Sequence, residues 1–194
     1  MPITKNRKAK LIQVANQRQE GVIVLEDIHD PHNAAAVLRT CDGFGFQKVC
    51  FIFEKETQFN PKKVGKATSS SANKWLDFEV FTSTEKCFKK LKRQGFEIYA
   101  TVLDQKAKPL FKTKFKKAKI ALALGNEHAG LSKKAMDLAD FKVYLPMQGF
   151  VQSLNLSVTA AIFMYEIFRQ RQGNKKYNLP KKESLKLLKN WLGK

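Results

Sequence analysis

Short apolar segments alternate with segments of helical periodicity along most of this 194-residue chain. The apolar segments are four to seven residues long, which is typical of strands buried in a parallel sheet. Strands are predicted at residues 22–26, 48–53, 97–103, 120–124 and 142–145, with a further short strand at 78–81. Because predicted helices separate these strands, the pattern indicates an α/β fold with a mostly parallel sheet and helices on both faces.

Helical periodicity predicts helices at residues 3–18, 33–44, 83–94, 131–138, 154–171 and 181–192. The first and last of them carry only narrow apolar stripes, which in the last helix consist of Leu185, Leu188 and Trp191. We therefore expect the two terminal helices to be accessory elements that pack on the main domain. Proline, glycine and a run of three serines within residues 59–75 predict an irregular loop there.

The composition is that of one globular domain with a core, since 43% of the residues are hydrophobic. No apolar run is long enough to cross a membrane, and the N-terminus lacks the apolar centre of a secretory signal. Cys41, Cys50 and Cys87 show no CxxC spacing, so we expect small buried residues in a reducing cytoplasm. His29 and His32 form an HxxH pair without further ligands nearby, and we expect no bound metal.

Positive charge is concentrated in three segments. Residues 1–19 carry a net charge of +5, residues 106–119 carry +7 and residues 169–194 carry +8, so the rest of the chain is close to neutral although the total is +19. Solubility requires neither this magnitude nor this segregation. The distribution therefore indicates a polyanionic partner, and nucleic acid is favoured because no amphipathic lipid-binding face is evident.

Polar side chains gather at three predicted strand ends, where open α/β sheets place their ligands. The first group is Asn33 and Arg39, whose six-residue separation in a regular helix would turn the side chains to different azimuths. The second is the sequence GNEHAG at residues 125–130, and the third is a polar loop within residues 145–157 that precedes an apolar helix. A single cap suffices for most helices, so the density of polar groups in this loop favours a ligand site.

Each group also has a purely structural explanation. Arg39 could pair with Asp42 or Glu26, and Glu127 could be a carboxylate favoured by the start of a helix. The polar loop could supply only an N-cap and a turn. Known motifs narrow the choice, because the chain has no GxGxxG after its first strand, no P-loop and no GxSxG elbow. A dinucleotide site and a serine hydrolase are therefore disfavoured.

Three segments, in order along the chain, carry a family resemblance. They are residues 26–40 (EDIHDPHNAAAVLRT), 122–132 (LALGNEHAGLS) and 145–158 (LPMQGFVQSLNLSV). With these motifs the chain resembles the SPOUT-class RNA ribose 2′-O-methyltransferases, and in particular the TrmH-type tRNA guanosine-18 methyltransferases. The resemblance implies a C-terminal deep trefoil knot made by the second and third segments, which general rules of topology would not predict.

The resemblance further implies S-adenosylmethionine as the cofactor and methyl transfer to a ribose 2′-hydroxyl of RNA. The implied cofactor contacts are Thr101, Gly125, Leu145, Met147 and Leu154. The implied catalytic residues are Arg39, Asn33, Glu127, Ser153 and Asn155. The family assigns the arginine as the base, a demanding role for a group that normally stays protonated. Stabilisation of the developing alkoxide by its charge is the alternative.

The resemblance also gives the charged segments a role. It implies a basic RNA-binding helix at residues 1–19, a methyltransferase domain at 20–172 and a basic extension with an amphipathic helix at 173–194. Phosphate contacts are expected at Arg7, Lys8, Arg18, Arg169 and Arg171. A homodimer with a shared active site is expected, with helix 154–168 at its interface. The alternatives are a ribosomal RNA ribose methyltransferase and a knotted RNA-binding module without catalysis.

Overall fold

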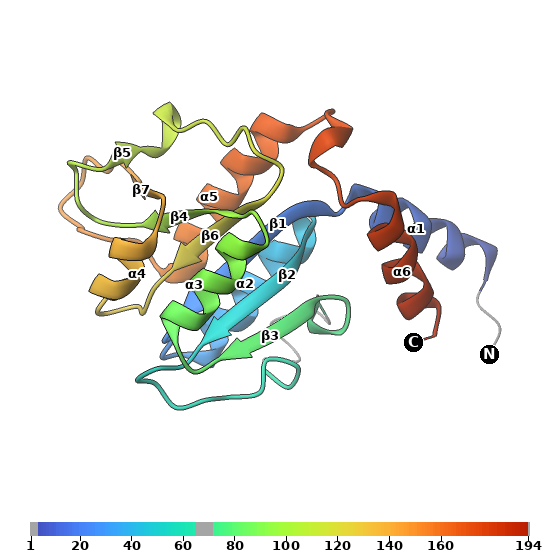
Figure 1. Cartoon of the computed structure of the whole chain (residues 1–194), viewed down its shortest axis with the longest axis horizontal. Coiled ribbons are helices and arrows are strands. Elements are labelled where there is room, and N and C mark those ends of the chain that lie inside the picture. Colours follow the sequence, from blue (N-terminus) through green and yellow to red (C-terminus); the bar gives the residue numbers. More distant parts are fainter. Residues whose placement is uncertain (1–3, 65–71, 194) are drawn as a thin grey trace.

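Seven parallel strands form one sheet in the computed structural model of the protein, which describes residues 4–64 and 72–193 (Figure 1). The strand order is β3-β2-β1-β6-β4-β7-β5. The strands are β1 (Gln19–Glu26), β2 (Phe46–Ile52), β3 (Asp77–Phe81), β4 (Glu97–Thr101), β5 (Lys108–Pro109), β6 (Ile120–Leu124) and β7 (Phe141–Tyr144). The predicted α/β class and the parallel sheet are therefore confirmed, and the implied knot stays a prediction.

All six predicted helices are present. They are α1 (Lys5–Gln17), α2 (Pro31–Gly43), α3 (Thr84–Arg93), α4 (Lys133–Leu138), α5 (Leu156–Arg171) and α6 (Lys181–Leu192). Helix α5 begins two residues later than predicted because the side chain of Asn155 caps it, accepting a hydrogen bond from the backbone N–H of Ser157 at 2.8 Å. Three short 3-10 turns complete the described chain: η1 (Ala72–Lys74), η2 (Leu110–Lys112) and η3 (Lys175–Tyr177).

The pattern missed one strand and leaves one predicted loop partly untested. Strand β5 lies in the lysine-rich segment, where no apolar pattern marks it, and only its pairing with β7 makes it a strand. Of the irregular loop predicted at residues 59–75, the stretch 65–71 lies outside the described residues.

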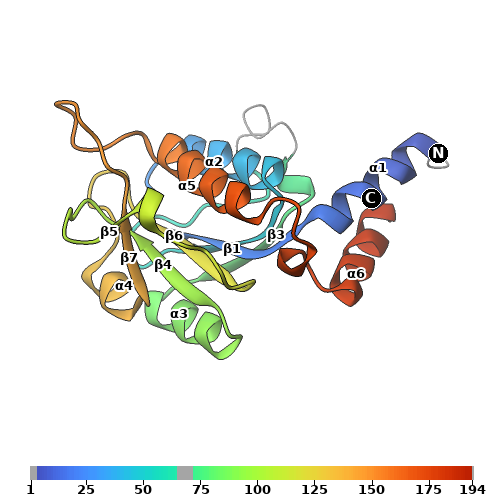
Figure 2. The same cartoon turned by 90° about the horizontal axis from the view of Figure 1, so that it is seen from above.

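Two helices cover each face of the sheet (Figure 2). Helices α2 and α5 pack on one face against residues such as Ile23 and Leu25, while α3 and α4 pack on the other against Val22 and Val24. Successive residues of a strand point to opposite faces, so a central strand covered on both sides must be apolar throughout. For this reason every residue of β6 is buried. The predicted helices on both faces are confirmed.

Helices α1 and α6 lie together at one end of the molecule, beyond the sheet (Figures 1 and 2). Their narrow apolar stripes face each other, with Leu11 and Ala15 of α1 packed against Leu187 and Trp191 of α6. The expectation that these stripes lie against the main domain is thus corrected in part, because they pack on each other and Trp75 is the main-domain residue in the same cluster. The predicted stripe of α6 is also corrected, because Leu185 is 57% exposed and Leu187 lies inside instead.

Two further sequence-based expectations can be compared with the structure. All three cysteines are free and buried, as predicted. Within the residues that the structure describes, no helix has the length and apolar character needed to cross a bilayer.

Candidate active site

A cavity of about 650 Å³ lies at the carboxyl edge of the sheet. The segments after β1, β4, β6 and β7 form its walls together with the first turns of α5. Parallel strands end at the same edge, so loops far apart in the sequence meet there. The five residues implied as cofactor contacts all line this cavity: Thr101, Gly125, Leu145, Met147 and Leu154.

The charge of the cavity is opposite to that of the protein. Carboxylates of Asp30, Asp104 and Glu127 line it, and no lysine or arginine among the described residues does. The chain as a whole carries a net charge of +19. Apolar side chains, among them Leu145 and Met147, supply much of the remaining wall. The lining therefore favours a ligand that is partly apolar and carries positive charge.

Four of the five implied catalytic residues come together in this cavity, which is lined by Asn33, Glu127, Ser153 and Asn155. Three of them form a chain of hydrogen bonds. The amide of Asn33 donates to Oε1 of Glu127 at 2.9 Å, and the amide of Asn155 donates to Oδ1 of Asn33 at 3.0 Å. Both polar ends of the Asn33 side chain are thereby fixed.

Arg39 does not join this group. It lies on α2 six residues after Asn33, and its side chain is exposed without a hydrogen bond or ion pair to any residue that the structure describes. The separation along a regular helix explains the difference, because it turns the two side chains to different azimuths. The alternative in which Arg39 pairs with Asp42 or Glu26 is also absent among the described residues. Asp42 binds Arg18, and Glu26 binds Thr84 and Ser132.

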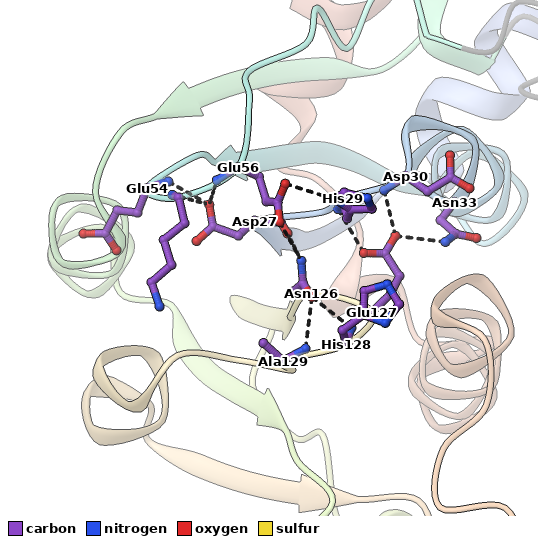
Figure 3. Close-up of polar contacts among 11 residues, drawn as sticks. Asp27, His29, Asp30, Asn33, Glu54, Glu56, Asn126, Glu127, His128 and Ala129 are labelled. Atoms are coloured by element: carbon purple, nitrogen blue, oxygen red, sulfur yellow. Dashed lines mark hydrogen bonds and ion pairs between the residues drawn. The ribbon is translucent and has the colours of Figure 1, made fainter.

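Glu127 joins the loop after β6 to the start of α2 (Figure 3). In addition to the bond from Asn33, its carboxylate accepts hydrogen bonds from the backbone N–H groups of His29 at 2.9 Å and Asp30 at 3.2 Å. Burial by itself would raise the pKa of the Glu127 carboxyl, but these hydrogen bonds outweigh it and hold the pKa below its usual range. Glu127 is thus an ionised clamp between two motif loops.

Asp27, which was not among the candidate polar groups, and Asn126 of the GNEHAG segment join the same loops (Figure 3). Asp27 has a φ of 50°, and its Oδ1 accepts hydrogen bonds from the backbone N–H groups of residues 54, 55 and 56 at 2.8, 2.9 and 3.2 Å. The Asn126 amide donates to the carbonyl of Asp27 at 2.7 Å and to Glu56 at 3.3 Å. A left-handed non-glycine residue is strained, so these contacts hold it in place.

The loop at residues 125–130 closes on itself. Asn126 and Gly130 exchange backbone hydrogen bonds at 3.0 and 2.9 Å. A Cβ on Gly125 would lie 2.2 Å from backbone atoms of Gly130 and Leu131, so only glycine fits there. Gly125 therefore allows the backbone to pack closely, and this packing directs Glu127 toward α2.

The two histidines of the HxxH pair bind carboxylates. The His29 ring lies 3.1 Å from Glu56, and this hydrogen bond raises the pKa of His29, while the His32 ring lies 3.1 Å from Asp30. In the described part of the chain, no group of three or more His, Cys, Asp and Glu side chains is placed to hold a metal ion.

The structure divides the expected phosphate contacts into two groups. Arg7 and Lys8 are exposed on α1, and Arg169 is exposed on α5, where it pairs with Glu166 at 2.8 Å. Arg18 and Arg171, in contrast, are 1% and 3% exposed. Their expected role as phosphate contacts is corrected, because the Nη groups of both arginines already bind acceptors within the protein.

The contacts of these two arginines explain their burial. Arg18 binds Asp42 at 2.5 Å. Arg171 donates to the backbone carbonyl of Lys117 and lies over the ring of Tyr177, with 4.8 Å from guanidinium to ring centroid. Burial lowers the pKa of Arg171 to about 10. Each arginine thus joins a terminal segment to the main domain.

Comparisons with known proteins fit this geometry. Residues 20–165 match the model of the SpoU rRNA Methylase family. The tRNA (guanosine(18)-2′-O)-methyltransferase of Thermus thermophilus is 34% identical over 98% of both chains. The crystal structure of an A. aeolicus TrmH/SpoU tRNA modifying enzyme superposes with a TM-score of 0.87 and 29% identity, covering 97% of this chain and 96% of that one. The SpoU methyltransferase AviRb of Streptomyces viridochromogenes, solved in complex with the cofactor AdoMet, shares the fold (TM-score 0.68, 24% identity, 80% and 60% coverage).

The Glu127 clamp gives a testable prediction. Glu127→Gln places an amide against three N–H donors, and we expect the free energy of unfolding to fall by about 2 kcal/mol at pH 7. Because the pKa of Glu127 is lowered on folding, its stabilisation is present at neutral pH and is lost as the pH falls through the folded-state pKa. Urea denaturation at a series of pH values from 7 downward should show a difference between variant and wild type that shrinks as the pH falls.

The matched control is Glu85→Gln, which removes an exposed carboxylate paired with Lys89 at i,i+4. Because this pair is exposed to solvent, the substitution should change the stability much less than Glu127→Gln does. Equal effects of the two substitutions at pH 7 would show that Glu127 is not a clamp.

Proposed function

The chain belongs to the SpoU rRNA Methylase family, and we propose that it transfers a methyl group from S-adenosylmethionine to the ribose 2′-hydroxyl of guanosine 18 in tRNA. The observation that carries this choice of RNA is the extent of the similarity. The family model covers only residues 20–165, whereas the tRNA enzyme of Thermus thermophilus aligns with 98% of the chain. The similarity therefore includes α1 and α6, which lie outside the family model.

The cavity suits S-adenosylmethionine on the basis of its own lining. This cofactor combines a planar, largely apolar adenine with a positively charged sulfonium group. Leu145, Met147 and Leu154 offer apolar surface, and the carboxylates of Asp104 and Glu127 suit a cation. We assign as its contacts the five implied residues that line the cavity: Thr101, Gly125, Leu145, Met147 and Leu154. When bound, the cofactor supplies a methyl group already activated for transfer.

The residues of the chain then have to hold a ribose and manage its proton. Asn33 and Asn155 are fixed by their hydrogen-bond chain, and Ser153 lies on the same wall of the cavity, so these three side chains orient the sugar. Glu127 acts through Asn33 and the two motif loops, and is a positioning residue. A 2′-hydroxyl is a poor nucleophile at neutral pH, so charge must be stabilised as its proton leaves.

Arg39 takes the electrostatic role in this proposal. A guanidinium group holds its proton at neutral pH and is a poor base, whereas its charge stabilises a developing alkoxide. Arg39 is exposed and has no partner among the described residues, so RNA can reach it, and the proton released from the 2′-hydroxyl passes to solvent. Arg39 and Asn33 point to different sides of α2. This arrangement supports a site that is completed only when RNA and a second subunit are in place.

We assign residues 20–172 to methyl transfer and the segments 1–19 and 173–194 to RNA binding. Arg7 and Lys8 on α1 and Arg169 on α5 are the exposed cations of the expected set. Phosphate contacts of this kind release counterions and do not depend on base sequence. A tRNA substrate places the enzyme in the cytoplasm.

A homodimer is part of the proposal. Large apolar side chains are exposed on α5 and the loop before it: Phe150, Val151, Leu154, Val158 and Tyr165. Val158 and Tyr165 are seven residues apart and lie on one side of the helix, away from its buried residues. An exposed apolar patch of this kind supports an interface with a second copy that runs along the cavity wall.

Methyl transfer can be tested by incubating the protein with S-adenosylmethionine and either total tRNA or ribosomal RNA. Mass spectrometry of the digested RNA should find 2′-O-methylguanosine at position 18 of tRNA, the position named for the relatives. Methylation of ribosomal RNA alone would exclude the tRNA assignment. Cofactor binding without transfer to either RNA would favour a binding module.

Arg39→Ala tests the electrostatic role. We expect kcat to fall by at least about a hundredfold, because a charge that acts in the transition state is lost, while the Kd for S-adenosylmethionine stays within about twofold. Arg93→Ala, at the end of α3 on the opposite face of the sheet, is the matched control and should leave both values unchanged. A loss of cofactor affinity in Arg39→Ala would instead indicate a structural role.

Val158→Glu tests the dimer. A buried, unpaired carboxylate at the interface should shift the protein to a monomer in sedimentation equilibrium and abolish methyl transfer. Leu185→Glu, at an exposed apolar position of α6, should leave the oligomeric state unchanged. A Val158→Glu protein that sediments like the wild type would contradict this interface.

A further inference from the structure

A second cavity, of about 330 Å³, lies between α1, α6 and the turn after η1. It shares no lining residue with the candidate active site. Its apolar wall is made by Leu11, Val14, Trp75 and Trp191. The two indole rings stand edge to face, with centroids 5.6 Å apart and an angle of 80° between their planes. Trp191 is 1% exposed and Trp75 is half-buried, so the cavity presents the Trp75 indole to a flat aromatic group.

Cations surround the aromatic wall. Arg7 and Lys10 of α1 line the cavity and are exposed, and Arg18 lines it from within the protein. The acidic residue in the lining is Asp42, which binds Arg18 at 2.5 Å. The free charge at the mouth of the cavity is thus positive, and it belongs to a segment with a net charge of +5. An occupant should carry negative charge beside its aromatic group.

Arg18 also presents an unused donor. Its guanidinium lies 5.2 Å from the centroid of the Trp191 ring, and its two Nη groups donate to the carbonyl and the carboxylate of Asp42 at 3.0 and 2.5 Å. Its Nε is buried and has no hydrogen-bond partner among the residues that the structure describes, and the side chain is 1% exposed. Buried donors are nearly always paired in folded proteins, so an unpaired one points to a missing acceptor.

We propose that this cavity binds one unpaired base of the RNA substrate, with the flanking phosphates on Arg7 and Lys10. A nucleobase has a flat π-face for the indoles and ring nitrogen or carbonyl acceptors for Arg18. Base-paired RNA stacks its bases inside the helix and could offer only phosphates. The inference deepens the proposed function, since it gives α1 and α6 a contact with an unstacked nucleotide at a distance from methyl transfer.

The position of the cavity supports such a second contact. Helices α1 and α6 lie at one end of the molecule, whereas β7, β5 and α4, beside the candidate active site, lie at the other (Figure 1). An RNA bound in both places would span the molecule, which fixes its register as well as its affinity.

Intrinsic fluorescence can test the proposal directly, because the chain contains two tryptophans and both line this cavity. A single-stranded RNA of about ten nucleotides should quench the emission in a saturable manner. A blunt duplex at the same phosphate concentration should not. Equal quenching by both RNAs would show that the cavity reads charge alone, and no quenching by either would overturn the proposal.

Trp75→Ala and Trp75→Phe test the same point in catalysis. The acceptor that binds Trp191 Nε1 at 3.2 Å is the backbone carbonyl of Trp75, which both variants keep. We expect the KM for tRNA to rise between about fivefold and a hundredfold in Trp75→Ala, with kcat and the Kd for S-adenosylmethionine unchanged. Trp75→Phe restores an aromatic face and should recover most of the affinity. An unchanged KM in Trp75→Ala would overturn the proposal.

Two outcomes separate this inference from the proposed function. Methylation of tRNA with no quenching by single-stranded RNA leaves the function in place and removes the base pocket. Quenching by single-stranded RNA without any methyl transfer leaves the pocket in place and removes the proposed function. If Trp75→Ala does not fold, Val14→Phe fills the cavity from α1 and should weaken RNA binding in the same way.

Discussion

The candidate active site depends on one clamp, the Glu127 carboxylate at the start of α2. Three donors converge on it, two of them backbone N–H groups at the end of the β1 loop and one the amide of Asn33. It adds to the bond between the Asn126 amide and the Asp27 carbonyl, which also joins the loops after β1 and β6. The clamp is ionised because its hydrogen bonds outweigh the effect of burial. The orientation of Asn33, and through it of Asn155, follows from this contact.

Charge is divided within the molecule in a way that fits two different ligands. The main cavity is lined by carboxylates and apolar groups, while exposed lysines and arginines lie on the terminal segments and on the surface. A surface that attracts a cationic cofactor would repel a polyanionic RNA. Separation of the two kinds of lining allows one protein to bind both.

The terminal helices carry both structural and binding groups. Arg18 and Arg171 join them to the main domain through buried hydrogen bonds and contacts with aromatic rings. Such arginines cannot be distinguished from phosphate contacts by sequence, since the same residue type in the same basic segment serves either purpose. Only burial separates them. The small core of α1 and α6 also creates the tryptophan-lined cavity, which no single segment could form.

The sequence by itself determined the helices, the parallel sheet and every strand except β5, because apolar periodicity is a local property that burial on two faces imposes on each segment. It also marked Asn33, Glu127, Ser153 and Asn155, through motifs whose residues line one cavity. The tertiary structure alone decided which of the candidates touch. Asp27 and Asn126 meet across 99 residues of chain, and two expected phosphate contacts are buried. These outcomes depend on how distant loops and helices meet, and hydrogen bonds between distant segments leave no periodic trace in a sequence.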